Sequence, residues 1–152
     1  MKFLSALKLR RGGAVGGEVR FSCAENEDKV RDIAILGAKG EKLAKKLLKK
    51  KGYKFIANNY NVPGQGEIDL IFADGAAIVF VEVKTRRSES FVPAEKVVHF
   101  GKQKKLFKAA DKFVRVNKLY DRPLRFDVVI VIDDDGNVEV RHYENAFRPG
   151  KR

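Results

Sequence analysis

The stretch GEIDLIFADGAAIVFVEVKTR, residues 66–86, decides the fold of this chain. Two apolar runs, residues 67–72 and 78–84, lie on either side of an Asp-Gly pair, and this pattern is a strong signal for a β-hairpin. If Asp74-Gly75 is a two-residue turn, Asp69 lies opposite Phe80. The sequence therefore predicts a hairpin in this register.

Side chains alternate between the two faces of a strand, so the hairpin has a polar face and an apolar face. The polar face carries Glu67, Asp69, Glu82 and Lys84. The apolar face carries Ile68, Leu70, Phe72, Val79, Val81 and Val83.

Asp69 and Glu82 become diagonal neighbours, roughly 7–8 Å apart at the backbone. Their carboxylates can then share one cation with oxygen ligands at about 2.0–2.6 Å. Three carboxylates on one patch repel each other without a cation or proton, which favours a metal site.

A second interpretation needs no metal. Glu82 and Lys84 could form a surface ion pair worth at most about 1 kcal/mol, and Glu67 and Asp69 could be solvated residues at a sheet edge. For an isolated Glu-x-Lys tripeptide this interpretation is the better one. The combination of Asp69 with Glu82-Val83-Lys84 across a hairpin, in a basic protein, favours the metal site.

The rest of the chain alternates helical and extended patterns. The expected elements are a helix from about Val30 to Lys51, a strand over 53–57, a turn-rich loop over 58–66, a helix from about 94 or 101 to 117, and strands over 124–132 and 138–143. The order predicts an α/β sandwich with a central mixed β-sheet flanked by helices. Residues 1–30 are expected to form an N-terminal extension, and residues 31–146 the domain.

Composition limits the class of partner and of metal. The chain has 152 residues and a net charge of +12, which favours polyanionic partners. A basic partner of ribosomes or membranes would share this charge, but would not explain the hairpin carboxylates. The single Cys23 excludes a disulfide framework and a Cys-based zinc site. His99 and His142 lie far apart in the sequence, which disfavours a histidine site and leaves a hard, oxygen-bound metal.

No stretch is long enough to span a membrane, and the N-terminal apolar run is too short for a signal peptide, so we expect a cytoplasmic protein.

The pair of motifs GEIDLI, residues 66–71, and FVEVKTR, residues 80–86, resembles the YraN-type uncharacterised bacterial family. That family is similar to Holliday-junction resolvases and to the restriction-endonuclease-like superfamily. The likeness covers roughly residues 35–143, with weaker matches around Gly37–Glu41, Asn58–Tyr60, Lys102 and Arg125–Val129. It implies a restriction-endonuclease-like three-layer sandwich.

The resemblance also implies roles for individual residues. Asp69 and Glu82 match the metal-binding carboxylates, and Lys84 matches the lysine that orients or activates the attacking water. Glu41 matches an acidic residue of the first helix, and Gln103 an accessory polar residue of some relatives. Helical geometry places Glu41 about 20° beyond Leu48, at the border of the buried face. On periodicity alone, an ordinary solvated glutamate is an equally good interpretation.

These observations lead to one functional hypothesis and one alternative. The hypothesis is an endonuclease that uses Mg²⁺ or Mn²⁺ to hydrolyse phosphodiester bonds in DNA rather than RNA, with branched or junction DNA as the suggested substrate. Glu67 would be an accessory acid, and the phosphate contacts would come from Arg86, Arg87, Lys102, Lys104, Lys105 and Lys108. A homodimer would allow two strands to be cut symmetrically. The alternative is a nucleic-acid-binding protein that keeps the fold without cleavage.

Overall fold

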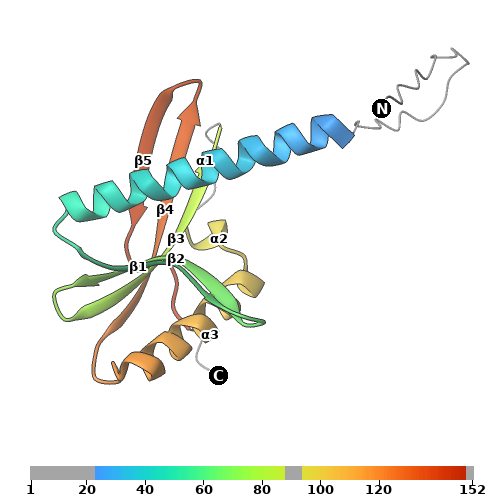
Figure 1. Ribbon diagram of the computed structural model, residues 1–152. Helices are drawn as coiled ribbons and strands as arrows, with labels where there is room; N and C mark the ends of the chain where they lie inside the picture. The colour runs from blue at the N-terminus through green and yellow to red at the C-terminus, as the bar shows by residue number, and fades with distance from the viewer. Residues whose placement is uncertain (1–22, 88–93, 150–152) are drawn as a thin grey trace, which may run out of the picture.

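A five-stranded mixed sheet lies between two long helices (Figure 1). The computed structural model describes residues 23–87 and 94–149. The strands follow one another across the sheet in chain order: β1 (Lys54–Val62), β2 (Gly66–Asp74), β3 (Ala77–Arg86), β4 (Leu124–Asp134) and β5 (Asn137–Tyr143). Helix α1 (Cys23–Lys50) covers one face, and α3 (Phe100–Asn117) covers the other, preceded by the short α2 (Ala94–Val97). The predicted α/β sandwich with a central mixed sheet is confirmed.

The mixed character of the sheet comes from one pair of strands. β3 and β4 pair in parallel, from Ile78 with Leu124 to Arg86 with Ile132, whereas the other neighbours are antiparallel. A parallel pair needs a long crossover between its strands. The segment that contains α2 and α3 supplies this crossover, so α3 lies on one face of the hairpin formed by β2 and β3.

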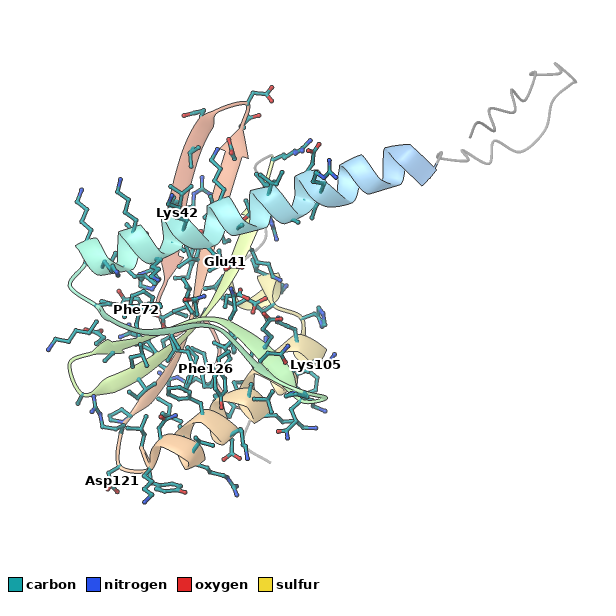
Figure 2. All side chains as sticks on the ribbon, in the orientation of Figure 1. Glu41, Lys42, Phe72, Lys105, Asp121 and Phe126 are labelled. Atoms are coloured by element: carbon teal, nitrogen blue, oxygen red, sulfur yellow. The ribbon has the colours of Figure 1, made fainter. Side chains whose placement is uncertain are left out.

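The sheet separates two apolar cores. The core beneath α1 contains Ala44, Leu48, Tyr53, Leu70, Phe72, Val79, Val81, Val129 and Val131. The core beneath α3 contains, among others, Ile68, Ile71, Ile78, Phe80, Leu106, Ala110, Phe113, Phe126, Val128 and Ile130. Figure 2 labels Phe72 in the first core and Phe126 in the second. Strand β4 contributes to both cores, so it is buried on both faces.

Two predicted boundaries are wrong. β1 continues to Val62 instead of ending at Ala57, and the expected loop shrinks to a short turn before Gly66. Asn58 and Asn61 favour turns on their own, but each is paired with a residue of β2, and pairing overrides local preference. Helix α1 begins at Cys23 rather than near Val30, so it includes part of the expected extension. Residues 1–22 of that extension lie outside the described residues.

The register of the hairpin also differs from the prediction. Asp74 pairs with Ala77 and Leu70 with Val81, so Gly75 and Ala76 form the turn. Gly75 has a φ of 56°, in the left-handed region that glycine adopts without strain. The guanidinium of Arg122 donates hydrogen bonds to the carbonyls of Gly75 and Ala76, which holds this turn. Each residue of β2 therefore has a partner two positions further along β3 than predicted, and the predicted pairing of Asp69 with Phe80 is wrong.

A buried polar network fastens the sheet near the turn of the hairpin. Asp127 of β4 is fully buried and accepts hydrogen bonds from Arg125 at 2.9 Å and from the backbone N–H of Asn145 at 2.9 Å, and its Oδ2 lies 2.8 Å from His142 Nε2. Burial alone would raise the pKa of Asp127, but these bonds hold it below its ordinary value. Arg125 also contacts Asp74 at 2.9 Å. This network explains Asp127 as a structural residue.

Within the described residues, neither long helix is apolar enough over a sufficient length to cross a membrane. The N-terminal part of α1 extends past the edge of the sheet (Figure 1). Ile33 and Ile35 are exposed there. Only the part of α1 from about Gly40 onward lies close against the strands, with Gly40, Ala44 and Leu48 buried.

Gly40 is the point of closest approach between α1 and β3. A Cβ atom built on Gly40 would lie 2.0 Å from Thr85 Oγ1 and 3.2 Å from Thr85 Cβ. Gly37 lies one turn earlier, and a Cβ atom there would meet nothing within 4 Å. Of these two glycines, only Gly40 lies in close contact with β3.

We predict that Gly40→Ala lowers the free energy of unfolding by about 1–3 kcal/mol, because the added methyl group forces Thr85 or the helix to move. Gly37→Ala is the matched control, and it should raise stability by about 0.5–1 kcal/mol through helix propensity alone. Urea denaturation of both variants measures this difference. Thr85→Ala should restore most of the loss when combined with Gly40→Ala. Equal effects of the two alanines would contradict the close contact.

Candidate functional site

The two strands of the hairpin part at Asp69. Backbone pairing between β2 and β3 ends at Leu70 and Val81, and the next N–H on that side, from Val83, donates instead to Asp69 Oδ2 at 2.7 Å. Ile68 and Leu70 would share a face in a regular strand, but they belong to opposite cores. The prediction that Ile68 shares a face with Val81 is therefore wrong, because β2 turns where its pairing with β3 ends.

Continuing the observed register places Asp69 directly beside Glu82 rather than diagonal to it. Glu82 is one of two buried acidic residues in the described part of the chain, with 2 % of its surface exposed. Its Oε1 lies 2.8 Å from the Nζ atom of Lys84. Its Oε2 lies 3.3 Å from the Nζ atom of Lys102, yet it accepts no hydrogen bond from any described residue. A buried carboxylate oxygen without a hydrogen bond is costly, so this atom is suited to accept a further cationic partner.

Asp69 is strongly affected by this environment. Burial raises the pKa of its carboxyl group from 3.8 to about 7, and the neighbouring charge of Glu82 adds to the rise. The hydrogen bond from Val83 and the charge of Lys102 oppose the rise without cancelling it. Near neutral pH, a proton and a metal ion would therefore compete for the same carboxylate.

A cavity of about 420 Å³ opens over these side chains. Its charged lining consists of Glu41, Asp69, Glu82, Lys84, Arg86, Arg87 and Lys102. The structure thus brings together all four residues predicted to be catalytic and three of those predicted to bind phosphate. The register is shifted by two residues, an even number, so Asp69, Glu82 and Lys84 still line one cavity, although Ile68 leaves the face that it was predicted to share with Val81.

Glu41 reaches the cavity from α1. It lies on the side of the helix that faces the sheet, whereas Lys42 lies on the opposite side (Figure 2). Burial raises the pKa of Glu41, and the charge of Glu67 adds to the rise, while a hydrogen bond with the Asn59 side chain lowers it. The border position expected from the helical periodicity is confirmed.

The remaining predicted residues lie outside the lining of the cavity. Glu67 is exposed, and the Gln103 side chain donates to the carbonyl of Val98 at 2.7 Å. Lys104 lies over the Phe100 ring at 4.5 Å from its centroid, and Lys105 and Lys108 are exposed on α3. The structure therefore separates the two predicted accessory residues from the acidic pair, and it leaves these three lysines on the neighbouring surface.

Two contacts of the site are absent from the predictions. His99 caps the N-terminus of α3, where its Nδ1 accepts from the backbone N–H of Lys102 at 3.2 Å. Histidine is not among the residue types that usually cap helices, so no capping signal was available in the sequence. The side chain of Asn59 forms a hydrogen bond with Glu41, and the backbone of Asn59 has a φ of 50°. The Asn-rich sequence around it had indicated only a loop.

The donor set fits a hard divalent cation such as Mg²⁺ or Mn²⁺. Such ions prefer carboxylate oxygens, and Glu82 offers one buried oxygen without a hydrogen bond beside the carboxylate of Asp69. In the described parts of the chain, however, no three His, Cys, Asp or Glu side chains are close enough to hold a metal as a group. The expected gathering of three carboxylates is thus reduced to the pair Asp69 and Glu82, with Glu41 across the cavity.

Comparison with known proteins shows what this arrangement is similar to. The sequence model of the uncharacterised protein family UPF0102 matches residues 40–131. The chain belongs to this family. The UPF0102 protein of Thermodesulfovibrio yellowstonii is 44% identical over 112 residues, which cover 74% of this chain and 95% of the relative. That of Geotalea uraniireducens is 41% identical over 123 residues, covering 80% and 95%, and that of Clostridium perfringens is 39% identical over 115 residues, covering 74% and 93%. The resemblance to the YraN-type family is thereby confirmed.

The UPF0102 match includes every charged residue that lines the cavity. It begins at Gly40, where α1 meets the sheet, and it ends within β4. The part of α1 that extends past the sheet lies outside the match.

We predict that Asp69 makes the stability of this UPF0102 protein depend on pH when no metal is bound. Its pKa in the folded state, about 7, lies above its ordinary value of 3.8, so the folded protein binds the proton more tightly than the unfolded chain does. The free energy of unfolding should therefore fall as the pH rises from about 4 to about 7. Asp69→Asn should flatten this part of the profile. Urea denaturation in EDTA at a series of pH values measures the slope, and identical slopes for both proteins would show that Asp69 titrates normally.

Proposed function

We propose that this UPF0102 protein is a metal-dependent endonuclease that hydrolyses phosphodiester bonds in DNA. The observation that carries the proposal is the buried Glu82, which has one oxygen paired with Lys84 at 2.8 Å and the other without a hydrogen bond, beside the half-buried Asp69. Such a pair is costly for a protein to maintain. The pair lies in an open cavity lined with cationic residues, which favours a role in binding or catalysis over a role in stability.

Asp69 and Glu82 would hold Mg²⁺ or Mn²⁺ through their carboxylate oxygens. When bound, such an ion supplies a Lewis acid for the phosphodiester and lowers the pKa of water. The hydrogen bond from Val83 to Asp69 Oδ2 fixes that side chain and leaves Oδ1 for a ligand. Glu82 is fixed by burial within β3.

Lys84 would act on the attacking water rather than on the ion. Its ammonium group touches Glu82, and its side chain is 38% exposed, so Lys84 reaches from the buried acid to the solvent of the cavity. An ammonium in this position orients a water molecule and neutralises charge that develops on the phosphate. Glu41, whose pKa is raised mainly by burial, would hold or release a proton from the α1 side of the cavity.

The cations around the cavity would position the DNA backbone. Arg86, Arg87 and Lys102 lie on its walls, and Lys104, Lys105 and Lys108 continue along α3. Contacts of this kind recognise phosphate without reading sequence, which suits a branched or junction substrate. The restriction-endonuclease-like resemblance of the hairpin and the sandwich architecture support the same proposal. Cutting two strands of a junction symmetrically would call for two protomers.

Cleavage should depend on Asp69 and Lys84. We expect the wild-type protein to cut at least one of branched, flap and linear DNA in the presence of Mg²⁺ or Mn²⁺. Asp69→Asn should reduce the rate to background, and Lys84→Met should lower it by on the order of 100-fold or more, because stabilisation at the reacting phosphate is lost. Glu139→Gln is the control, since it removes an exposed acid of β5 that pairs with Arg141 and does not line the cavity. Gel analysis of labelled substrates measures all four proteins.

Binding and cleavage should separate in Asp69→Asn. DNA affinity comes mainly from Lys and Arg contacts to phosphate, so in EDTA the variant should bind close to the wild type, and both affinities should fall steeply with salt. Fluorescence anisotropy at several salt concentrations measures this. If affinity persists while no substrate is cut under either metal, the non-catalytic binding protein is the correct reading. If affinity is absent as well, both readings fail.

A further inference from the structure

Lys102 stands apart from the other cations of the cavity because it faces both carboxylates. Its Nζ atom lies 3.3 Å from Glu82 Oε2, and its charge is one of those that act on Asp69. Lys84 pairs with the other oxygen of Glu82. The Lys102 ammonium therefore lies beside the oxygen of Glu82 that has no hydrogen bond, which is the oxygen available to a further cation.

The fold fixes the backbone of Lys102 but not the end of its side chain. Its N–H group donates to both the carbonyl and the Nδ1 atom of His99, which places Lys102 in the first turn of α3. The side chain is 27% exposed, and its approach to Glu82 lacks the geometry of a hydrogen bond. A lysine has four rotatable bonds beyond its Cα atom, so the ammonium can leave Glu82 while the helix stays in place.

Among the acidic pair and the two lysines that contact Glu82, the charges balance only while Lys102 is present. Ionised Asp69 and Glu82 together carry two negative charges, and Lys84 and Lys102 carry two positive ones. A divalent ion added to this set would meet an ammonium at the position it must enter. A DNA phosphate beside the cavity would offer that ammonium another partner.

We propose that Lys102 occupies the cation position between Asp69 and Glu82 in the metal-free protein, and that it moves to a DNA phosphate when the divalent ion enters. The proposal rests on the metal site of the proposed function. Lys102 is then a positioning residue, and it makes metal and DNA bind cooperatively, because each removes an obstacle to the other. The free protein binds metal weakly, and the site becomes fully loaded only on DNA.

The test measures metal affinity, not activity. Mn²⁺ is titrated into the full chain without DNA, and free Mn²⁺ is followed by its EPR signal. Lys102→Gln removes the charge and keeps a polar group that can remain beside Glu82. It should lower the Kd for Mn²⁺ by on the order of tenfold, the effect expected of one charge within about 5 Å of a divalent ion even at the screening of water. Lys102→Arg keeps the charge and should bind Mn²⁺ no more tightly than the wild type.

Lys108→Gln is the matched control, because it removes an exposed charge from the same helix away from Glu82. It should change the Kd by less than about twofold, since exposed charges are screened over such distances. A second arm adds an oligonucleotide in a Lys84→Met background, which should cut it far more slowly than the wild type does. DNA should tighten Mn²⁺ binding there, and should do so less when Lys102→Gln is also present.

The outcomes distinguish this proposal from the proposed function. If Asp69→Asn abolishes Mn²⁺ binding while Lys102→Gln and Lys108→Gln behave alike, the metal site stands and the role of Lys102 is refuted. If Asp69→Asn binds Mn²⁺ as the wild type does, the metal site and the role of Lys102 fail together. If only Lys102→Gln binds Mn²⁺ measurably, and adding Asp69→Asn removes that binding, the ammonium is confirmed as the competitor.

Discussion

The hydrogen bond from the Val83 N–H to the carboxylate of Asp69 is the interaction on which the site depends. If β2 and β3 were paired along their whole length, there would be no room for a ligand between them. Their ladder ends at Leu70 and Val81, and a side-chain carboxylate takes over the N–H that a backbone carbonyl would otherwise have bound. The parted strand is held from the other side by α3, where a Cβ atom on Gly66 would lie 2.6 Å from the carbonyl oxygen of Lys105. The opening in the sheet is therefore built into the packing of both strands.

The same arrangement places charge where a stable protein would avoid it. Glu82 sits in the middle layer of the fold with 2% of its surface exposed, and its neighbour Asp69 has a pKa near that of a histidine side chain. Strand β4 shows how the same chain treats an acid that serves the fold, since Asp127 is surrounded by donors and its pKa is lowered. The two buried acids of the sheet thus lie in contrasting environments: Asp127 has hydrogen-bond donors around it, whereas Glu82 has one oxygen without a hydrogen bond. That contrast distinguishes a structural carboxylate from one available to a ligand.

Much of this could be predicted from the sequence because short-range patterns determine it. The apolar alternation around Asp74-Gly75 identified the hairpin, and its parity was enough to put Asp69, Glu82 and Lys84 on one face. The register could not be predicted, since Arg122, far along the chain, binds the carbonyls of Gly75 and Ala76 and selects the turn. The contact between Lys102 and Glu82 could not be predicted either, because it depends on how α3 crosses the sheet. It also depends on the His99 cap, a residue type that no capping rule anticipates. Which side chains share a face of a hairpin can be predicted from one sequence. Contacts between segments that are far apart in the chain can be seen only in the folded structure.

The parallel pairing of β3 with β4 has a consequence for how the chain folds. Strands β1 to β3 are joined by tight turns and can pair as soon as they are made, but β4 reaches β3 only after the whole segment containing α3 has closed into a loop. Closing such a loop costs entropy before its contacts form, so pairing of this kind is slow. The acidic pair is complete in the hairpin alone, while Lys102 arrives with α3. During synthesis, the two carboxylates therefore lie for a time in a water-exposed hairpin, and Lys102 reaches Glu82 only when α3 docks.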